Sequence, residues 1–287
     1  MNNWSVCIFA HNEQDHIRNA IESILKNVQS LDVRTSLHVI LNGSTDGTSE
    51  IVRALCQTYP AVVLHELALG DKANAWNHYV HQVAGDADLH FFCDGDLTVA
   101  PGSFSQLANT CLAHPEALLI PSIAAGGLSE TRYARHQIQH NGMSAFYAVS
   151  KETLAKFRAT KLVLPVGLIG DDSLLIWLCK NRFAPEKLAL DESAVSICES
   201  ASFKMEPRLY WRPDGALEHI RRQRRYAIRQ LQLERLLPIL RKKGMTALPV
   251  DINAVFEGEG MFSLVKDHLA NPFYWAAALR ILRTRLS

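Results

Sequence analysis

The chain has 287 residues, of which 48% are hydrophobic and 21% are charged. This is the composition of an ordinary globular protein, and it excludes disordered, collagen-like and coiled-coil chains. The 30 Lys and Arg residues and the 29 Asp and Glu residues give a net charge of +1, which excludes a globally basic nucleic-acid binder. The length suits one large α/β domain or two small ones.

The sequence predicts a cytoplasmic protein. No stretch is long and apolar enough to span a membrane, and the polar N-terminus lacks the basic region of a signal peptide. The six cysteines form no CxxC or CxxH pair, and several lie inside apolar runs. We therefore expect buried, reduced thiols rather than disulfides or a zinc site.

The first 115 residues alternate between strand and helix patterns. Short apolar runs predict strands at 6–10, 37–41, 61–64 and 89–93, and helical spacing predicts helices at 17–25, 49–55 and 72–83. Strands that alternate with helices predict a parallel sheet with helices on both faces. In such sheets ligands bind at the carboxyl ends of the strands. The loops that follow the strands, AHNE, LNGSTDG and CDGDL, carry the polar residues, so we expect the site there.

Beyond residue 115 the pattern changes. Residues 118–120 and 174–178 are apolar, residues 145–149 predict another strand, and residues 131–142 are polar. The rest of the chain is mostly helical and basic. Residues 204–243 hold 12 Lys and Arg against 4 Asp and Glu, a net charge of +8, so the remainder carries −7. The segment fits a solvated helix face, and its clustered arginines also suit phosphate groups.

Two acidic motifs are candidates for chemistry. Asp94, Gly95 and Asp96 end an apolar strand, where two carboxylates could converge on Mg²⁺ or Mn²⁺ and the glycine would let the backbone approach a ligand. A solvated turn has the same composition. Asp171 and Asp172 precede a helix and could act as a general base or as helix caps. The sequence has neither a GxGxxG after a strand nor a P-loop nor a GxSxG elbow, which argues against dinucleotide oxidoreductases, P-loop enzymes and α/β-hydrolases.

Read in order, the motifs resemble those of the inverting glycosyltransferase family 2. The series is VCIFAHNE, ILNGSTDGT, DKANAWN, FFCDGDLTVAPG, GDDSLL and RRQRRY, and it covers about residues 4–226. The resemblance implies an α/β chain with the GT-A fold, in which a Rossmann-like, mostly parallel sheet is flanked by helices and followed by a helical C-terminal extension. It implies a nucleotide-sugar-binding half at 1–115, an acceptor-binding half at 116–205 and a basic helical extension at 206–287.

The resemblance also assigns roles to residues. Asp172 would be the catalytic base, with Asp171 beside it. Asp96 would bind Mg²⁺ or Mn²⁺, and Asp94 and His219 are further candidate ligands. Asn77 would lie near the donor diphosphate, and Tyr226 stands where the family motif has Trp. The residues implied to bind the nucleotide sugar are Ala10, His11, Glu13, Asn42, Lys72, Asp94, Gly95, Arg222 and Arg225.

The sequence departs from the family at one position of the second-strand loop. Leu41 stands where the family has an Asp that contacts the base, so UDP-sugar and GDP-sugar donors both stay open. Processive members carry membrane helices after the basic motif, and their absence here predicts the addition of one sugar. The acceptor could be a glycan, a lipid-linked molecule or a small molecule.

Two other functions compete with this one. A nucleotidyltransferase with a related sheet would have a Gly-rich, basic first loop, which AHNEQD is not. A non-enzymatic protein could bind anionic lipid or nucleic acid through 204–243, although no nucleic acid is expected. The tail at 271–287 combines aromatic residues with Arg280, Arg283 and Arg285, and it could either lie on the cytoplasmic membrane face or pack on the catalytic domain.

Overall fold

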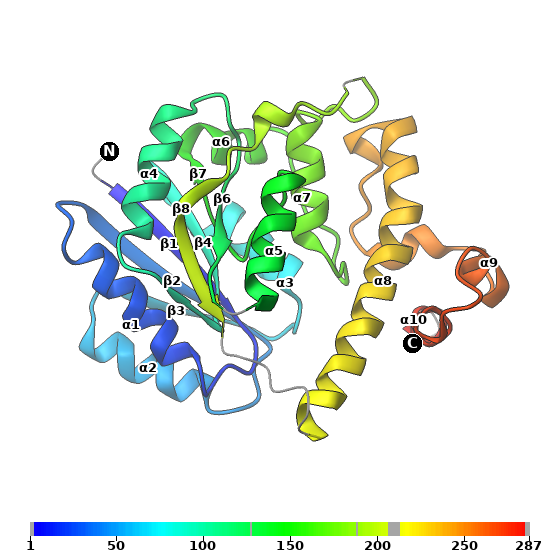
Figure 1. Cartoon of the computed structure of the whole chain (residues 1–287), viewed down its shortest axis with the longest axis horizontal. Helices are drawn as coiled ribbons and strands as arrows, with labels where there is room; N and C mark the ends of the chain where they lie inside the picture. The colour runs from blue at the N-terminus through cyan, green and yellow to red at the C-terminus, as the bar shows by residue number, and fades with distance from the viewer. Residues whose placement is uncertain (1–2, 127, 188, 206–212, 285–287) are drawn as a thin grey trace.

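A curled sheet forms the centre of the protein in the computed structural model, which describes residues 3–126, 128–187, 189–205 and 213–284 (Figure 1). Its eight strands lie in the order β3-β2-β1-β4-β7-β6-β8-β5. The strands are β1 (Asn3–Ala10), β2 (Arg34–Asn42), β3 (Val62–Leu67), β4 (Leu89–Asp94), β5 (Leu97–Val99), β6 (Ile120–Ala124), β7 (Phe146–Ser150) and β8 (Cys198–Met205).

The first half of the sheet is parallel, as the sequence predicts. β1 pairs in parallel with β2 and β4, and β2 pairs in parallel with β3. The second half is mixed, because β7 runs antiparallel to both β4 and β6, and β5 runs antiparallel to β8. β5 has only three residues, too few to give a periodic signal, and the sequence does not predict it.

Helices cover both faces of the sheet, and the side chains of β1 show the division. Val6 and Ile8 point into one core with α1, α2 and α4, whereas Cys7 and Phe9 point into another with α3, α6 and α7. The helices are α1 (Ile17–Val28), α2 (Thr48–Thr58), α3 (Lys72–His78), α4 (Ser103–Ala113), α5 (Leu128–Gln139), α6 (Lys151–Ala159) and α7 (Asp171–Lys180). A π-helical turn, η1 (Tyr79–Val83), extends α3, so the helix predicted at 72–83 changes its hydrogen-bonding pattern half-way.

The C-terminal region is helical, and its long helix α8 (Pro213–Lys243) packs in two directions. Leu236 and Leu240 join the core of the α3 face. Ile228 and Leu231 belong to a smaller core with the short helices η4 (Ile252–Phe256) and α9 (Met261–Val265) and with α10 (Pro272–Thr284). Two further short helices, η2 (Glu192–Ala194) and η3 (Met245–Ala247), lie in connections.

The last helix packs its inner face against the other C-terminal helices, α8 and α9 among them. Ala277 and Ala278 are buried in the smaller core, while Trp275 and Leu279 on the other face are exposed. Contact with a membrane stays a prediction, and Arg285 lies outside the described residues. The predicted segment boundaries also stay predictions, since residues 206–212 after the second boundary are not described.

Candidate active site

Three of the predicted loops meet at one edge of the sheet. β1, β2 and β4 are neighbours, with Ala10 opposite Leu41 and Phe9 opposite Asp94, and their carboxyl ends point to the same edge (Figure 1). The polar segments that follow these strands are therefore brought together by strand pairing alone, as predicted.

An ion cluster occupies this edge. Lys72, the first residue of α3, places its Nζ 2.6 Å from Asp94 Oδ1 and 4.0 Å from Asp171 Oδ2. Burial alone would lower the pKa of Lys72, but Asp94, Asp171 and Asp172 outweigh it and raise this pKa. Lys72 is therefore a permanent cation that joins strand β4 to helix α7.

The two carboxyls around Lys72 are hard to ionise. Burial raises the pKa of Asp94, and Asp96 adds to this while Lys72 opposes it. Burial also raises the pKa of Asp171 to about 6, again against Lys72 and with help from Asp172 and Asp94. The cluster thus concentrates more negative charge than one lysine neutralises, which suits a site that binds further cationic groups.

Asp171 and Asp172 face different surroundings although they are adjacent in α7. The Asp171 side chain is 16% exposed and lies toward Lys72. The Asp172 side chain is 38% exposed, and its Oδ1 lies 4.0 Å from Arg229 Nη1. Asp172 Oδ1 also accepts the backbone N–H of Ser173 at 2.8 Å. Both aspartates line one narrow cavity; its other lining residues are Phe9, Lys72, Phe92, Cys93, Asp94, Met143, Ser144, Ala145, Tyr147 and Leu175.

The chain before these aspartates is held by side chains from two helices. We call residues 162–170 the site loop. Asp71 accepts the N–H of Gly167 at 2.8 Å, and Gln232 of α8 accepts the N–H of Ile169 at 2.8 Å and donates to Gly167 O at 2.9 Å. The sequence does not reveal these roles of Asp71 and Gln232, because each contact joins residues that are remote along the chain. Asp71 and Gly167 are 96 residues apart, and Gln232 and Ile169 are 63 residues apart.

Asn77 of α3 holds the site loop through its side-chain amide. Its side chain donates to Leu164 O and accepts the N–H of Leu164, both at 2.8 Å. Both polar atoms of the amide are therefore engaged by the backbone of the site loop. Asn77 positions this loop, and its predicted place near the diphosphate stays a prediction.

Hydrogen bonds join the loop after β1 to the loop after β2. His11 Nδ1 lies 2.6 Å from Asn42 O, and the N–H of Glu13 donates to Thr48 Oγ1 at 2.9 Å. Asn42 is buried, and its Oδ1 has no hydrogen-bond partner among the described residues. Leu41 is buried in the core and cannot reach a ligand, which fits the predicted loss of the family's base contact.

Gly95 packs closely against β1, where a side chain would not fit. A Cβ at Gly95 would lie 2.8 Å from Ala10 Cβ and 3.1 Å from Phe9 O. Its N–H donates to Phe9 O at 2.8 Å, so the turn between Asp94 and Asp96 lies directly against β1. A side chain at this position would therefore clash inside the chain, and the predicted contact of Gly95 with the nucleotide sugar stays a prediction.

The basic helix α8 brings Arg222, Tyr226 and Arg229 onto one face, at spacings of four and three residues. The Arg222 guanidinium lies 5.4 Å from the centre of the Tyr226 ring, and that of Arg229 lies 5.8 Å from it. Arg229 lies outside the RRQRRY motif. Its spacing of seven residues from Arg222, two turns of a helix, is the sequence signal that places both on one face. His219 and Arg225 are exposed on the same helix, and their predicted contacts stay predictions.

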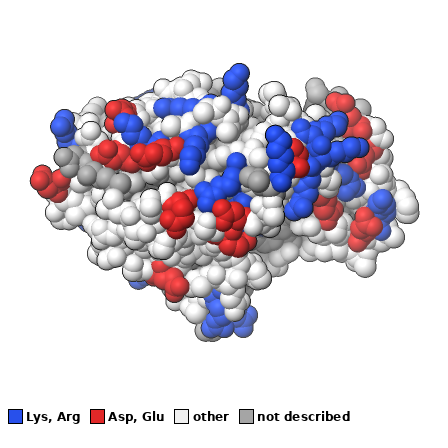
Figure 2. Space-filling view, turned by 90° about the horizontal axis from the view of Figure 1, so that it is seen from above, with Lys and Arg blue, Asp and Glu red and all other residues white. Residues whose placement is uncertain are grey.

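The charge of the basic segment is divided between two places. The last turn of α8 holds Arg241, Lys242 and Lys243, and Figure 2 shows blue side chains gathered over this end of the helix. Because an α-helix rises 1.5 Å per residue, this last turn lies about 30 Å from Arg222 along the helix axis. Basic residues at a helix C-terminus are stabilised by the helix dipole, so this end has a structural explanation of its own.

A divalent cation would rely on few protein ligands here. The described residues contain no group of three or more His, Cys, Asp or Glu that could hold a metal ion. Asp94 is held by Lys72, and the role of Asp96 as the carboxylate that would hold a cation together with substrate phosphates stays a prediction. Mg²⁺ ordinarily binds in this way, through one or two carboxylates plus phosphate oxygens, so the residues present fit such a site.

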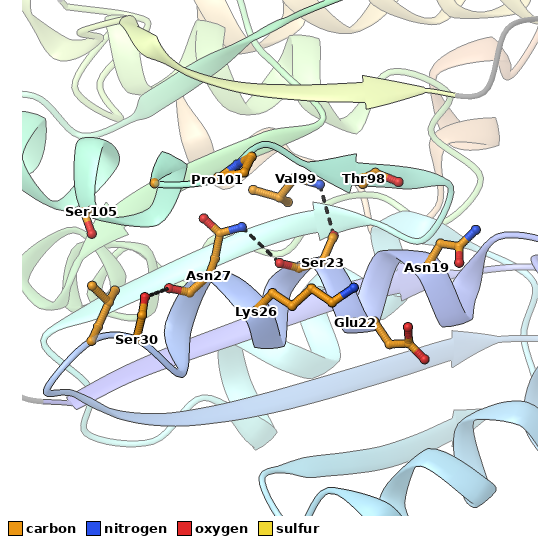
Figure 3. A pocket seen from close by; sticks show the side chains of 12 residues that line it. Asn19, Glu22, Ser23, Lys26, Asn27, Ser30, Thr98, Val99, Pro101 and Ser105 are labelled. Carbon is orange, nitrogen blue, oxygen red and sulfur yellow. Dashed lines mark hydrogen bonds between the residues drawn. The ribbon is translucent and has the colours of Figure 1, made fainter.

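A larger cavity lies away from this edge. It has a volume of about 530 Å³ and runs between α1 and the start of α4, next to β5 (Figure 3). Asn27 lines it and donates to Ser23 O at 3.0 Å, while Ser23 Oγ accepts the N–H of Val99 at 3.0 Å. None of the predicted site residues lines this cavity.

A match to a protein-family model shows to which family the chain belongs. The family model described as Glycosyl transferase family 2 matches residues 5–166, more than half of the chain. The chain belongs to glycosyl transferase family 2. The matched range of this family 2 chain contains the loops AHNE, LNGSTDG and CDGDL, the last of which holds Asp94 and Asp96, and it also contains Lys72. It ends just before the two aspartates of α7.

Solved structures share the fold. A mannosyltransferase from Pyrobaculum calidifontis, in complex with GDP-Man and Mn²⁺, is 18% identical with a TM-score of 0.59 and covers 98% of this chain and 74% of its own. A glucosyl-3-phosphoglycerate synthase from Mycobacterium tuberculosis, with Mn²⁺, UDP-Glc and phosphoglyceric acid, is 22% identical with a TM-score of 0.53 and covers 79% and 78%. TarS of S. aureus with UDP-GlcNAc is 14% identical with a TM-score of 0.53 and covers 99% and 81%.

These likenesses confirm the predicted GT-A architecture of the family 2 chain. No curated protein matches the sequence. In the described part of the chain, no helix combines the length and the apolar character that crossing a membrane requires.

Proposed function

We propose that the protein transfers one sugar from a nucleoside-diphosphate sugar to an acceptor hydroxyl, with inversion at the anomeric carbon and with a divalent cation. One observation carries the proposal. In a chain of glycosyl transferase family 2, Lys72, Asp94, Asp171 and Asp172 meet at the carboxyl edge of the parallel strands. The solved structures with this fold carry GDP-Man, UDP-Glc or UDP-GlcNAc, which supports a nucleotide-sugar donor here.

Asp172 is proposed as the base because it is the more exposed aspartate. It would take the proton of the acceptor hydroxyl as the acceptor oxygen bonds to the anomeric carbon. The bond from that carbon to the diphosphate oxygen breaks on the opposite face, and the nucleoside diphosphate leaves with the electron pair. A single displacement of this kind inverts the configuration.

The remaining residues of the cluster hold charge in place. Lys72 is fixed by Asp94 and Asp171 and would stabilise the negative charge of the departing diphosphate, a preorganised electrostatic effect. Asp171 acts as a positioning residue through Lys72. A cation on Asp96 would neutralise the diphosphate as a Lewis acid. The proposed nucleotide-facing residues are the loops at Ala10, His11 and Glu13 and at Asn42.

A ligand panel tests the proposal. UDP, GDP, ADP and CMP are added to the protein with Mn²⁺, and with Mg²⁺ in a second series, and the melting temperature is measured. A ligand that binds only the folded state raises this temperature, so UDP or GDP with metal should raise it and CMP should not. A protein stabilised by none of them, but retained by DNA or anionic vesicles, would contradict the proposal.

Asp172→Asn then separates chemistry from binding. We expect the bound nucleotide to stabilise the variant as it stabilises the natural protein, while turnover of the donor falls by about 10²- to 10⁴-fold, the usual contribution of a general base. Asp191→Asn is the matched control, because Asp191 is bound by Arg182 at 2.8 Å, and Arg182 follows the C-terminal end of α7 whereas Asp172 lies at its start. Unchanged turnover in Asp172→Asn would remove the proposed base.

A further inference from the structure

The site loop lies along helix α3 and the π-helical turn η1, whose side chains bind its backbone. Asn77 of α3 binds both backbone groups of Leu164, at 2.8 Å each. One turn further along, His81 Nε2 donates to Leu162 O at 2.7 Å. Successive side chains on the helix thus hold alternate residues of the loop. The contact of His81 belongs to none of the motifs that the sequence predicts to form the site.

The order of the contacts shows that loop and helix run antiparallel. Asp71, directly before α3, accepts the N–H of Gly167, so the contacts move forward along the helix as they move back along the loop. From Asp71 to His81 the helix advances ten residues, about 15 Å at 1.5 Å per residue. From Gly167 back to Leu162 the loop covers five residues, about 16 Å when extended at 3.3 Å per residue. Because the two lengths agree, the contacts fit a single alignment of loop and helix.

Arg158 of α6 holds the end of the helix that carries His81. Its Nε donates to Val80 O at 2.7 Å, and its Nη2 donates to Ala84 O at 2.5 Å. The N–H of Ala84 donates to Tyr79 O, five residues back, which is the π-helical pattern. The last carbonyls of a helix have no partner inside it, and helix ends fray. Because Val80 and Ala84 lie on either side of His81 in the chain, Arg158 fixes the turn that presents His81 to the loop.

The site loop leads directly into the two aspartates of α7. It ends at Gly170, and Asp171 and Asp172 are the first two residues of the helix. Lys72, the first residue of α3, lies 4.0 Å from Asp171 Oδ2. One helix and its π-helical turn therefore contact both the loop and the start of α7. The place of Asp172 depends on how the loop lies along that helix.

We infer that His81 is a positioning residue for the transfer reaction. Through Leu162 O it fixes the alignment of the site loop with α3 and η1, and thereby the place of Asp172. Arg158 acts one step further away, because it holds η1. A general base must lie within hydrogen-bond reach of the proton that it takes, and a misplacement of about 1 Å can cost about 100-fold in rate. The inference rests on the proposed function and adds to it two residues that act through backbone carbonyls.

Hydrogen exchange tests the contact without any measurement of activity. Exchange is followed by mass spectrometry in peptides that cover residues 162–170, with peptides of β1 as the internal reference. His81→Leu removes the donor to Leu162 O, so the site loop should exchange about tenfold faster while β1 exchanges as in the natural protein. Arg158→Met should also speed exchange of the loop. Unchanged exchange of residues 162–170 in His81→Leu would overturn the inference.

Kinetics then separate positioning from a general loss of structure. His81→Leu should lower kcat for donor turnover about tenfold and change KM for the donor less than about twofold, because the loops after β1 and β2 keep their contacts. His81→Gln keeps an N–H donor and should restore kcat to within about threefold of the natural protein. Gln82→Leu makes the same polar-to-apolar change at the next exposed residue of η1 and is the matched control. Equal kcat in the leucine and glutamine variants of His81 would contradict a role for its hydrogen bond.

The proposed function can fail separately. If the protein turns over no nucleotide sugar but His81→Leu speeds exchange of the site loop, the contact is confirmed and its role in transfer is lost together with the proposed function. If His81→Leu loses kcat while exchange of the loop is unchanged, the transfer function stands and the positioning role of His81 is wrong.

Discussion

The site has two sides that are built differently. On the strand side, which we define as the ends of β1, β2 and β4, backbone pairing sets the positions of the residues. On the loop side, which comprises the site loop, the first turn of α7 and the facing part of α8, a few side chains set them. Lys72 connects the two sides.

The difference has a physical consequence. A strand end is fixed by a ladder of cooperating hydrogen bonds, so one polar substitution there leaves the geometry in place. The loop side depends on single contacts from Asp71, Asn77 and Gln232, and the loss of one leaves backbone groups without partners. The four substitutions that follow test this contrast.

Substitution of Lys72, which connects the two sides, should have the largest effect on turnover. Lys72→Met leaves Asp94 and Asp171 without their cation and removes positive charge from the diphosphate position, so kcat/KM for donor turnover should fall about 100-fold or more, or about 2.7 kcal/mol. Steady-state kinetics measure it. Lys151→Met, which breaks the exposed ion pair with Asp86, is the control and should change turnover little. Retention of half the activity by Lys72→Met would mean that the two sides work independently.

The strand side should be sensitive to packing. Gly95→Ala places a methyl group 2.8 Å from Ala10 Cβ, where two backbone segments meet, and overpacking of this kind costs about 1–3 kcal/mol. Chemical denaturation measures the free energy of unfolding. Gly85→Ala is the control, because a Cβ there meets nothing within 4 Å. If both variants unfold alike, the turn after β4 has room that the structure does not give it.

The loop side should be sensitive to the loss of the Gln232 side-chain amide. Gln232→Ala leaves Ile169 N–H and Gly167 O without their partner, and we expect turnover to fall about tenfold, or about 1.4 kcal/mol, with nucleotide affinity unchanged. Gln230→Ala in the same helix is the control, since Gln230 is exposed and its amide binds Glu234 of the same helix. A loss of nucleotide affinity equal to the loss of turnover would show that α8 supports both sides equally.

The last expected effect concerns stability and its dependence on pH, and not turnover. Asp171 has a pKa of about 6 in the folded protein, above its ordinary value, so the folded state binds more protons than the unfolded chain between about pH 4 and pH 6. The free energy of unfolding contributed by this group therefore falls as pH rises through that window, by on the order of 3 kcal/mol. Denaturation at pH 4, 5, 6 and 7 should show the fall in the natural protein relative to Asp171→Asn, and parallel curves would exclude it.

The sequence predicts the strand side well. Periodic apolar runs gave β1, β2 and β4 and their order along the chain, and the rule that ligands bind at strand ends placed the polar loops. The short strand β5 and the change to a π-helix at Tyr79 carry no periodic signal of their own.

The roles of single residues were harder to predict. The motifs singled out Gly95 and Asn77, but they did not predict that Gly95 packs on Ala10 or that Asn77 binds the backbone of Leu164. Arg229 and Gln232 were not identified at all, because their partners lie in α7 and the site loop, more than 50 residues earlier.

What the sequence by itself determined is the family, the parallel half of the sheet and the set of acidic and basic residues available for chemistry. These depend on local periodicity and on short motifs, which are properties of neighbouring residues. The tertiary structure alone decided which aspartate is exposed, which cation each carboxylate meets and which side chains hold the site loop. Those depend on distances between segments remote in sequence, and burial and charge at such contacts set the pKa of Asp171 and the position of Arg229.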